Sequence, residues 1–116
     1  MPVTTVREPL PAVGSLEGLS RLVVDGPDRL GGLSAVLWDG PERLLFVSDR
    51  GRLFAAGVRR DETGALDDLV DWSDHRPPYP GGRSDLEGLA VSQGQLLISV
   101  ELPPHVLRFA GPLARP

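Results

Sequence analysis

The sequence predicts an all-β fold, an incomplete β-propeller of about two four-stranded blades. Short apolar runs of strand length alternate with clusters of Gly, Pro and Asp, which are typical of turns. The pattern recurs in the second half of the chain at an offset of 52 to 56 residues, which is the spacing of propeller blades. Because 116 residues cannot hold even four such blades, we expect about two.

The domain organisation follows from this repeat. Residues 1–14 contain Pro2, Pro9 and Pro11 and are expected to form an irregular lead-in, since proline lacks a backbone donor. Residues 15–116 are expected to form one partial propeller domain, which includes a first strand near residues 19–24.

Blade one is predicted over about residues 31–74. Residues 33–37, 44–47 and 53–58 are apolar and are predicted as strands. The segments between them, residues 39–41 and 49–51, contain Asp and Gly and are predicted as tight turns. Together they predict an antiparallel meander.

The fourth segment of blade one is ambiguous. Residues 65–72 are predicted as an outer strand, and a short helix is the alternative because Leu66, Leu69 and Val70 also have helical spacing. Residues 74–84 hold three prolines and two glycines and are predicted as a loop between blades.

Blade two is predicted over about residues 85–116, truncated at its end. Its strands are expected at residues 86–91, 96–100 and 106–109.

The repeat aligns two pairs of segments. Residues 32–35 match residues 88–91 at an offset of 56, and residues 44–49 match residues 96–101 at an offset of 52. The second match places Asp49 and Glu101 at one repeat position.

Composition excludes several classes of function. The net charge is −4 and the twelve basic residues are all Arg, without a basic stripe, so nucleic acid is not an expected partner. The absence of Cys excludes disulfides and thiolate chemistry but leaves the compartment undecided. We expect no membrane span and no export signal in this sequence.

The chain resembles the bacterial phytase-like family, also called "esterase-like activity of phytase". The resemblance is carried by Gly31-Gly32-Leu33-Ser34, Ser48-Asp49-Arg50-Gly51 and Asp85-Leu86-Glu87-Gly88-Leu89-Ala90, with Val100-Glu101 following. It covers about residues 18–110 and is similar to the family's N-terminal part. It implies a β-propeller and a phosphoesterase or esterase function.

Three acids are the candidate metal ligands. Glu87 lies at the start of a first strand of a blade, whereas Asp49 and Glu101 lie at the ends of second strands. Loops of different blades converge at a propeller's central channel, where carboxylates can surround Ca²⁺, which takes 6 to 8 oxygen ligands. The alternatives are a turn residue for Asp49 and a solvated strand end for Glu101.

Two arginines are the candidate substrate-binding residues. Arg50 lies in the turn at residues 49–51, and Arg83 lies in the glycine-rich loop. If the substrate is a phosphate ester, a guanidinium can bind two of its oxygens, and a solvated surface charge is the alternative.

Three functional hypotheses follow. The first is a metal-assisted phosphoesterase or esterase acting on a small-molecule ester. The second is a calcium-dependent lactonase or gluconolactonase-like propeller, which Glu87-Gly88 resembles, although Leu89 stands where that family has proline. The third is a non-catalytic binding fragment, because further blades or another chain are needed to close the ring.

Overall fold

The computed structural model describes residues 2–16, 20–76, 86–101 and 104–110, and it confirms the all-β class. The described residues form nine strands in three sheets and one short 3₁₀ helix, η1. The elements are β1 (Thr4–Pro9), β2 (Ser20–Asp25), η1 (Asp28–Leu30), β3 (Leu33–Trp38), β4 (Arg43–Ser48), β5 (Leu53–Arg60), β6 (Leu66–His75), β7 (Leu86–Ser92), β8 (Gln95–Val100) and β9 (His105–Ala110).

Each sheet joins strands that follow one another along the chain. β1 and β2 form a two-stranded sheet, β3 to β6 a four-stranded sheet, and β7 to β9 a three-stranded sheet, and all pairs are antiparallel. The two predicted turns supply the required backbone angles, because Gly40 and Gly51 have positive φ, as Gly94 has in the β7–β8 turn. The two predicted meanders are therefore present, with three described strands in the second.

The prediction of an irregular lead-in at residues 1–14 is wrong. Residues 4–9 form β1, which pairs with β2 along its whole length, from Thr4 opposite Asp25 to Pro9 opposite Ser20. Pro9 is the last residue of β1, a position at the end of a strand in a sheet of only two strands, where a missing backbone donor is tolerated. The strand was not predicted because the three prolines of this segment indicated irregular structure.

The ambiguous segment after the β5–β6 turn is a strand, as predicted, and it extends to His75. β6 contains a bulge, since Ala55 pairs with Ser73 but Gly57 pairs with Val70. Within the bulge Asp71 has a φ of 52°, and the next residue, Trp72, stacks on Phe46 with ring centroids 5.3 Å apart. The segment of residues 77–85, predicted as a loop, lies outside the described residues.

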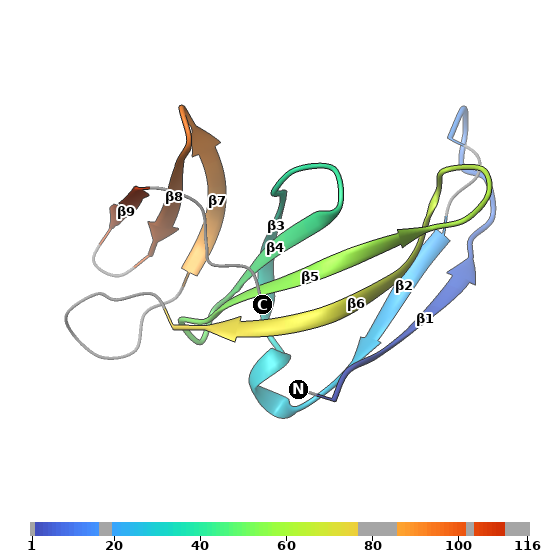
Figure 1. Cartoon of the computed structure of the whole chain (residues 1–116), viewed down its shortest axis with the longest axis horizontal. Coiled ribbons are helices and arrows are strands. Elements are labelled where there is room, and N and C mark those ends of the chain that lie inside the picture. The colour runs from blue at the N-terminus through green and yellow to red at the C-terminus, as the bar shows by residue number, and fades with distance from the viewer. Residues whose placement is uncertain (1, 17–19, 77–85, 102–103, 111–116) are drawn as a thin grey trace.

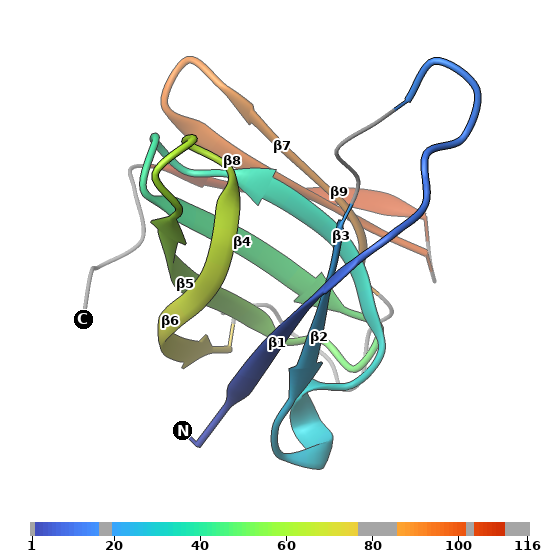
Figure 2. The ribbon, with the colours of Figure 1, turned by 90° about the vertical axis from the view of Figure 1, so that its right-hand side faces the viewer.

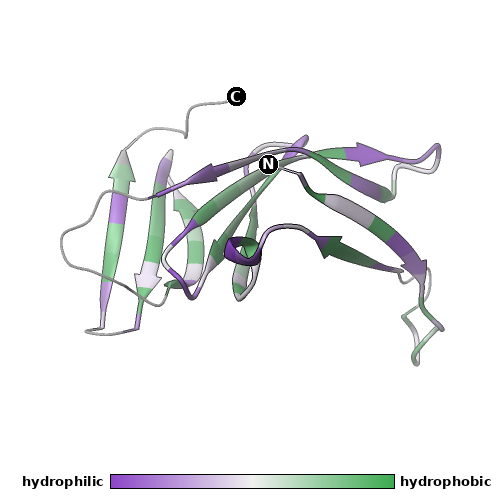
Figure 3. Cartoon of the chain, turned by 90° about the horizontal axis from the view of Figure 1, so that it is seen from below, coloured by the Kyte–Doolittle hydropathy of each residue, from purple (hydrophilic) through white to green (hydrophobic). Residues whose placement is uncertain are grey.

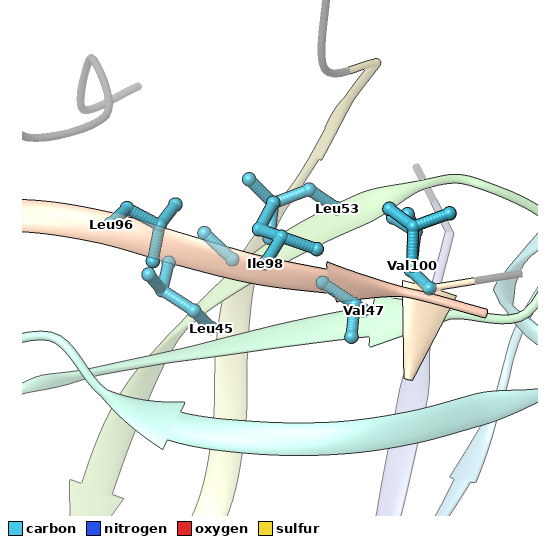
Figure 4. Close-up of a cluster of buried hydrophobic side chains, with 8 residues drawn as sticks. Leu45, Val47, Leu53, Leu96, Ile98 and Val100 are labelled. Atoms are coloured by element: carbon cyan, nitrogen blue, oxygen red, sulfur yellow. The ribbon is translucent and has the colours of Figure 1, made fainter. Parts of the chain in front are cut away.

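A first hydrophobic cluster joins the four-stranded sheet to the three-stranded sheet. Figure 4 shows Leu96, Ile98 and Val100 of β8 packed against side chains of β4 and β5. Alternate residues of a strand point to the same face, so these three side chains reach the core together. The cluster consists of Leu45, Val47, Leu53, Ala55, Leu86, Leu96, Ile98 and Val100.

A second cluster lies on the opposite face of the four-stranded sheet. Leu22 and Val24 of β2 pack against it from the two-stranded sheet. Its buried members are Leu30, Leu44, Phe46, Phe54, Ala56, Val58 and Leu69. Because β4 and β5 supply side chains to both clusters, the four-stranded sheet is the central layer.

The three sheets thus stack as layers, with β1–β2 and β7–β9 on opposite faces of β3–β6 (Figures 1 and 2). Figure 3 shows apolar residues along the strands of all three sheets and hydrophilic residues on η1. Among the described helices, none has the length and apolar character needed to cross a membrane.

Candidate functional site

The candidate site lies at the end of the layers where β3 and β7 begin. Strand pairing sets Leu33 opposite Ser48 and Leu86 opposite Val100, so β4 and β8 finish where β3 and β7 start. Asp49 and Glu101 follow directly after β4 and β8. We call this the Asp49 end of the sheets.

β3 and β7, the first strands of the four-stranded and three-stranded sheets, each carry a bulge at this end. The register of β3 shifts between Leu33 and Ala35, which leaves Ser34 as the extra residue. In β7 the register shifts in the same way around Glu87. Ser34 and Glu87 are therefore structurally equivalent.

This equivalence corrects the offset expected for the first strands. Residues 32–35 do not match residues 88–91 at an offset of 56, because Ser34 and Glu87 differ by 53 (87 − 34). The offset of 52 for the second strands holds, so Asp49 and Glu101 occupy equivalent positions. The one-residue difference is the extra residue in the β3–β4 turn.

Ser34 ties the two sheets together at this end. Its hydroxyl lies within hydrogen-bonding distance of the carbonyl oxygen of Leu86, at the start of β7, and 3.4 Å from that of Val47 in β4. A hydroxyl has one proton to donate, and either acceptor fixes the position of the bulge. Sequence analysis missed this contact, because the Ser34–Leu86 pair is separated by 52 residues.

Asp49 holds the entry into β3. Its backbone N–H donates to the carbonyl oxygen of Gly32 at 2.9 Å. Its carboxylate lies so close to Gly32 that a Cβ atom there would be 2.1 Å from Oδ1. The structure therefore supports the turn role that was the alternative for Asp49, with an exposed carboxylate at the site.

Arg50 lies beside a pocket between β2 and β3. One guanidinium nitrogen, Nη1, donates to the carbonyl oxygen of Asp28 in η1 at 3.0 Å. The pocket has a volume of about 500 Å³, and Asp25, Asp28 and Arg50 are its charged residues. This arrangement places one cation and two acids around an opening near the Asp49 end.

A charge network anchors η1, which lines this pocket with Asp28 and Leu30. Asp74 of β6 accepts hydrogen bonds from Arg29 of η1 at 2.8 Å and from Arg52 at 3.0 Å. One carboxylate between two guanidiniums joins η1 to the beginning of β5 and the end of β6.

Glu87 and Glu101 are both exposed at the Asp49 end. In residues 2–16, 20–76, 86–101 and 104–110, however, no three His, Cys, Asp or Glu side chains come together as metal ligands. The three predicted ligands therefore do not form a calcium site by themselves, since Ca²⁺ takes 6 to 8 oxygens. Arg83, the second predicted substrate-binding residue, lies outside the described residues.

The opposite end of the central sheet has a different character. Arg43, at the start of β4, is 5% exposed and forms an ion pair with Asp39, with 3.7 Å between Nε and Oδ2. Within the described part of the chain, no nitrogen of its guanidinium makes a hydrogen bond. The three candidate acids are thus exposed at the Asp49 end, whereas Arg43 is a buried cation at the other.

Comparison with known proteins decides the family. The model of the phytase-like family, described as "esterase-like activity of phytase", matches residues 28–115, which is most of the chain. The chain belongs to the phytase-like family. Neither the curated proteins nor the solved structures contain a match to it.

The segment matched by the phytase-like family model runs from η1 to beyond β9. It includes Asp49, Arg50, Glu87 and Glu101, so every described candidate residue belongs to the family-like part of the chain. β1 and β2 precede the matched segment.

Proposed function

We propose that this phytase-like chain is part of a hydrolase that acts on ester bonds, with phosphate esters as the first substrate class to test. The family match over residues 28–115 carries this proposal. The geometry adds support, because Arg50 and the equivalent acids Asp49 and Glu101 lie at one end of the sheets.

We further infer that the stacked sheets are successive blades of a propeller. Both described meanders start with a bulged strand, β3 contacts β7, and the hydroxyl of Ser34 in β3 reaches the carbonyl of Leu86, the first residue of β7. In such a ring the first strands line the centre, so Asp49, Glu87 and Glu101 would face one opening.

A cation at this opening needs ligands beyond the three acids. We propose Ca²⁺ because exposed carboxylates are its usual ligands, and the remaining oxygens have to come from outside the described residues. When bound, the ion would polarise an ester oxygen or activate water. The role of this chain's own residues is to present carboxylates, and that of Arg50 is to bind substrate oxygens.

Arg50 is suited to binding a phosphate ester. Only Nη1 has a hydrogen-bond partner among the described residues, the carbonyl of Asp28. That bond fixes the guanidinium at the pocket, and its exposed donors can bind two oxygens of an anion.

Hydrolysis assays test this proposal directly. Purified protein is incubated with a phosphate monoester, a carboxylic ester and a lactone, each with Ca²⁺ or with a chelator. We expect calcium-dependent release of phosphate, reduced at least about tenfold by Asp49→Asn and by Arg50→Ala, as for loss of a charged contact of about 1.4 kcal/mol or more. Glu62→Gln, an equal loss of charge at the β5–β6 turn, is the control.

The other outcomes select the alternatives. Turnover of the lactone alone would favour the lactonase hypothesis, which rests on Glu87 in the bulge beside Gly88. Absence of turnover with all three substrates would overturn the proposed function and favour a binding role.

A further inference from the structure

The two faces of the β3–β6 sheet are covered unequally. The β7–β9 sheet lies on the strands that begin the central sheet, since β7 contacts β3 and β4. On the other face β1 lies along β6, where the Thr5 hydroxyl donates to the carbonyl of Leu69 at 3.4 Å. Arg7 of β1 also pairs with Asp61 at 2.9 Å, near the β5–β6 turn. The two-stranded sheet thus covers the β6 side of this face.

The β3 side of that face is only partly covered, by the Arg60 guanidinium 5.2 Å above the Trp38 ring. Val36 pairs with Phe46 and Trp38 with Leu44, so both β3 side chains share a face with the second hydrophobic cluster. Val36 is 57% exposed and Trp38 is 47% exposed. Large apolar side chains that continue a buried cluster mark a surface that another layer can cover.

The neighbouring strand β2 has an unpaired edge at this place. In the described part of the chain, β2 is hydrogen-bonded to β1 alone. Residues Ser20–Asp25 contain no proline, so every backbone donor of the strand is present. An exposed edge of this kind is a template for a further strand.

The β7–β9 sheet has the complementary features. In the described residues β9 pairs with β8 alone, and it also lacks proline. On the sheet face away from the first cluster, Ser99 pairs with Gly88 and with Val106, which is 62% exposed. Gly88 has no side chain and that of Ser99 is small, so another sheet can approach this part of the face closely, beside the exposed Arg108.

We propose that these surfaces bind each other between two copies of this chain. The β7–β9 sheet of one copy would cover Val36 and Trp38 of the next, with β9 beside β2 of that copy. Within one chain, the β7–β9 sheet lies on β3 and β4 at one face of the central sheet. The β7–β9 sheet of another copy would lie over the same strands at the opposite face, and β1 and β2 would still cover the β6 side. Among the described strands, the β1–β2 sheet has none beside β2 on the β3 side, and the β7–β9 sheet has none beyond β9.

The strand directions agree with this pairing. β2 ends at Asp25, shortly before β3 begins at Leu33, so β2 runs toward the Asp49 end. β9 follows the turn after β8, which finishes at the Asp49 end, so β9 runs away from it. Side by side, β2 and β9 are antiparallel, as are all strand pairs within the chain.

The contact joins the β3 surface of one copy to the β7–β9 surface of the other. A pair of copies therefore still has one free surface of each kind. Such contacts close into rings when the rotation permits. Each copy supplies two main layers, and propellers have about four to eight blades, so a closed ring would hold about two to four copies. The number of copies rests on the propeller proposed above, whereas the association itself does not depend on the proposed hydrolysis.

Sedimentation of the 116-residue chain over a range of concentrations tests the proposal. We expect a mass about two to four times that of one chain at high concentration. Val36→Glu and Val106→Glu should each reduce the association constant at least about tenfold, because each buries a charge in the interface. Val13→Glu, in the exposed β1–β2 connection, should leave it unchanged.

Mixing the two interface variants gives the sharper result. Val36→Glu retains an intact β9 surface, and Val106→Glu retains an intact β3 surface. An equal mixture should therefore form dimers at concentrations where each variant alone, with its weakened association, stays a monomer. Circular dichroism of each variant checks that the sheets are retained.

Two results would overturn the proposal. One is a folded wild-type chain that stays a monomer at about 1 mM, where even a millimolar interface would be substantially occupied. The other is failure of the mixed variants to associate. Either would leave these surfaces to strands of a different polypeptide.

Discussion

Gly32 and Asp49 hold the start of β3 against the end of β4. Gly32 has a φ of +73°, in the left-handed region that other residues adopt at a cost. The Asp49 carboxylate also occupies the space that a side chain at Gly32 would need. The conformation of one residue thus positions the candidate acid.

At this scale we predict that Gly32→Ala destabilises the protein by about 1–2 kcal/mol, the cost of left-handed backbone for a residue with a Cβ. Urea unfolding measures the change. Gly88→Ala is the matched control, since its added Cβ would meet the rotatable Ser99 hydroxyl at 2.8 Å and its φ is not in that region. Equal loss in the two variants would contradict the strain argument.

Among the elements, the β7–β8 hairpin has the tightest connection. Ser92 pairs with Gln95, so Gln93 and Gly94 form the whole turn, with φ of 50° and 75°. Two positive φ angles define the hairpin turn whose twist matches that of its strands. Gln93 is the less suitable residue, because asparagine tolerates this conformation better than glutamine.

We therefore predict that Gln93→Asn stabilises the chain by about 0.5–1 kcal/mol. Thermal unfolding at low protein concentration checks the shift and keeps self-association out of the result. Gln95→Asn, one residue into β8, makes the same chemical change where the backbone is extended, and it should not stabilise. A destabilised Gln93→Asn variant would exclude the proposed turn geometry.

The whole molecule is held together by contacts between layers, and some of these are charged. Arg7 of β1 pairs with Asp61 and Asp67 at the β5–β6 hairpin. Hydrogen bonds from Thr63 and Arg7 hold the pKa of the Asp61 carboxyl well below its usual range. The folded state therefore favours the ionised carboxylate more than the unfolded state does.

The stability contributed by Asp61 is complete above its unfolded pKa of about 4 and is lost as the pH falls toward its lower folded pKa. We predict that Asp61→Asn lowers stability at pH 7 and that the difference from wild type shrinks as the pH falls below about 4. Urea unfolding at several pH values measures this. Glu62→Gln, in the same turn, should leave the acid dependence of wild type intact.

The sequence by itself determined the strands and most turns. Residues 33–37, 44–47 and 53–58 are strands as predicted, because alternation and turn residues act over a few neighbours. The same local rules failed at β1, where the pairing with β2 outweighed the prolines. The equivalence of Asp49 and Glu101 was also predicted correctly.

Tertiary structure alone decided how these elements meet. The bulges that make Ser34 equivalent to Glu87, and the hydroxyl contact from Ser34 to Leu86, depend on pairing between distant segments. No local pattern encodes which apolar face is left uncovered, so the exposure of Val36 and Trp38 was visible only in the stacked sheets. Local sequence chooses the conformation of a strand, and burial against partners far along the chain chooses its neighbours.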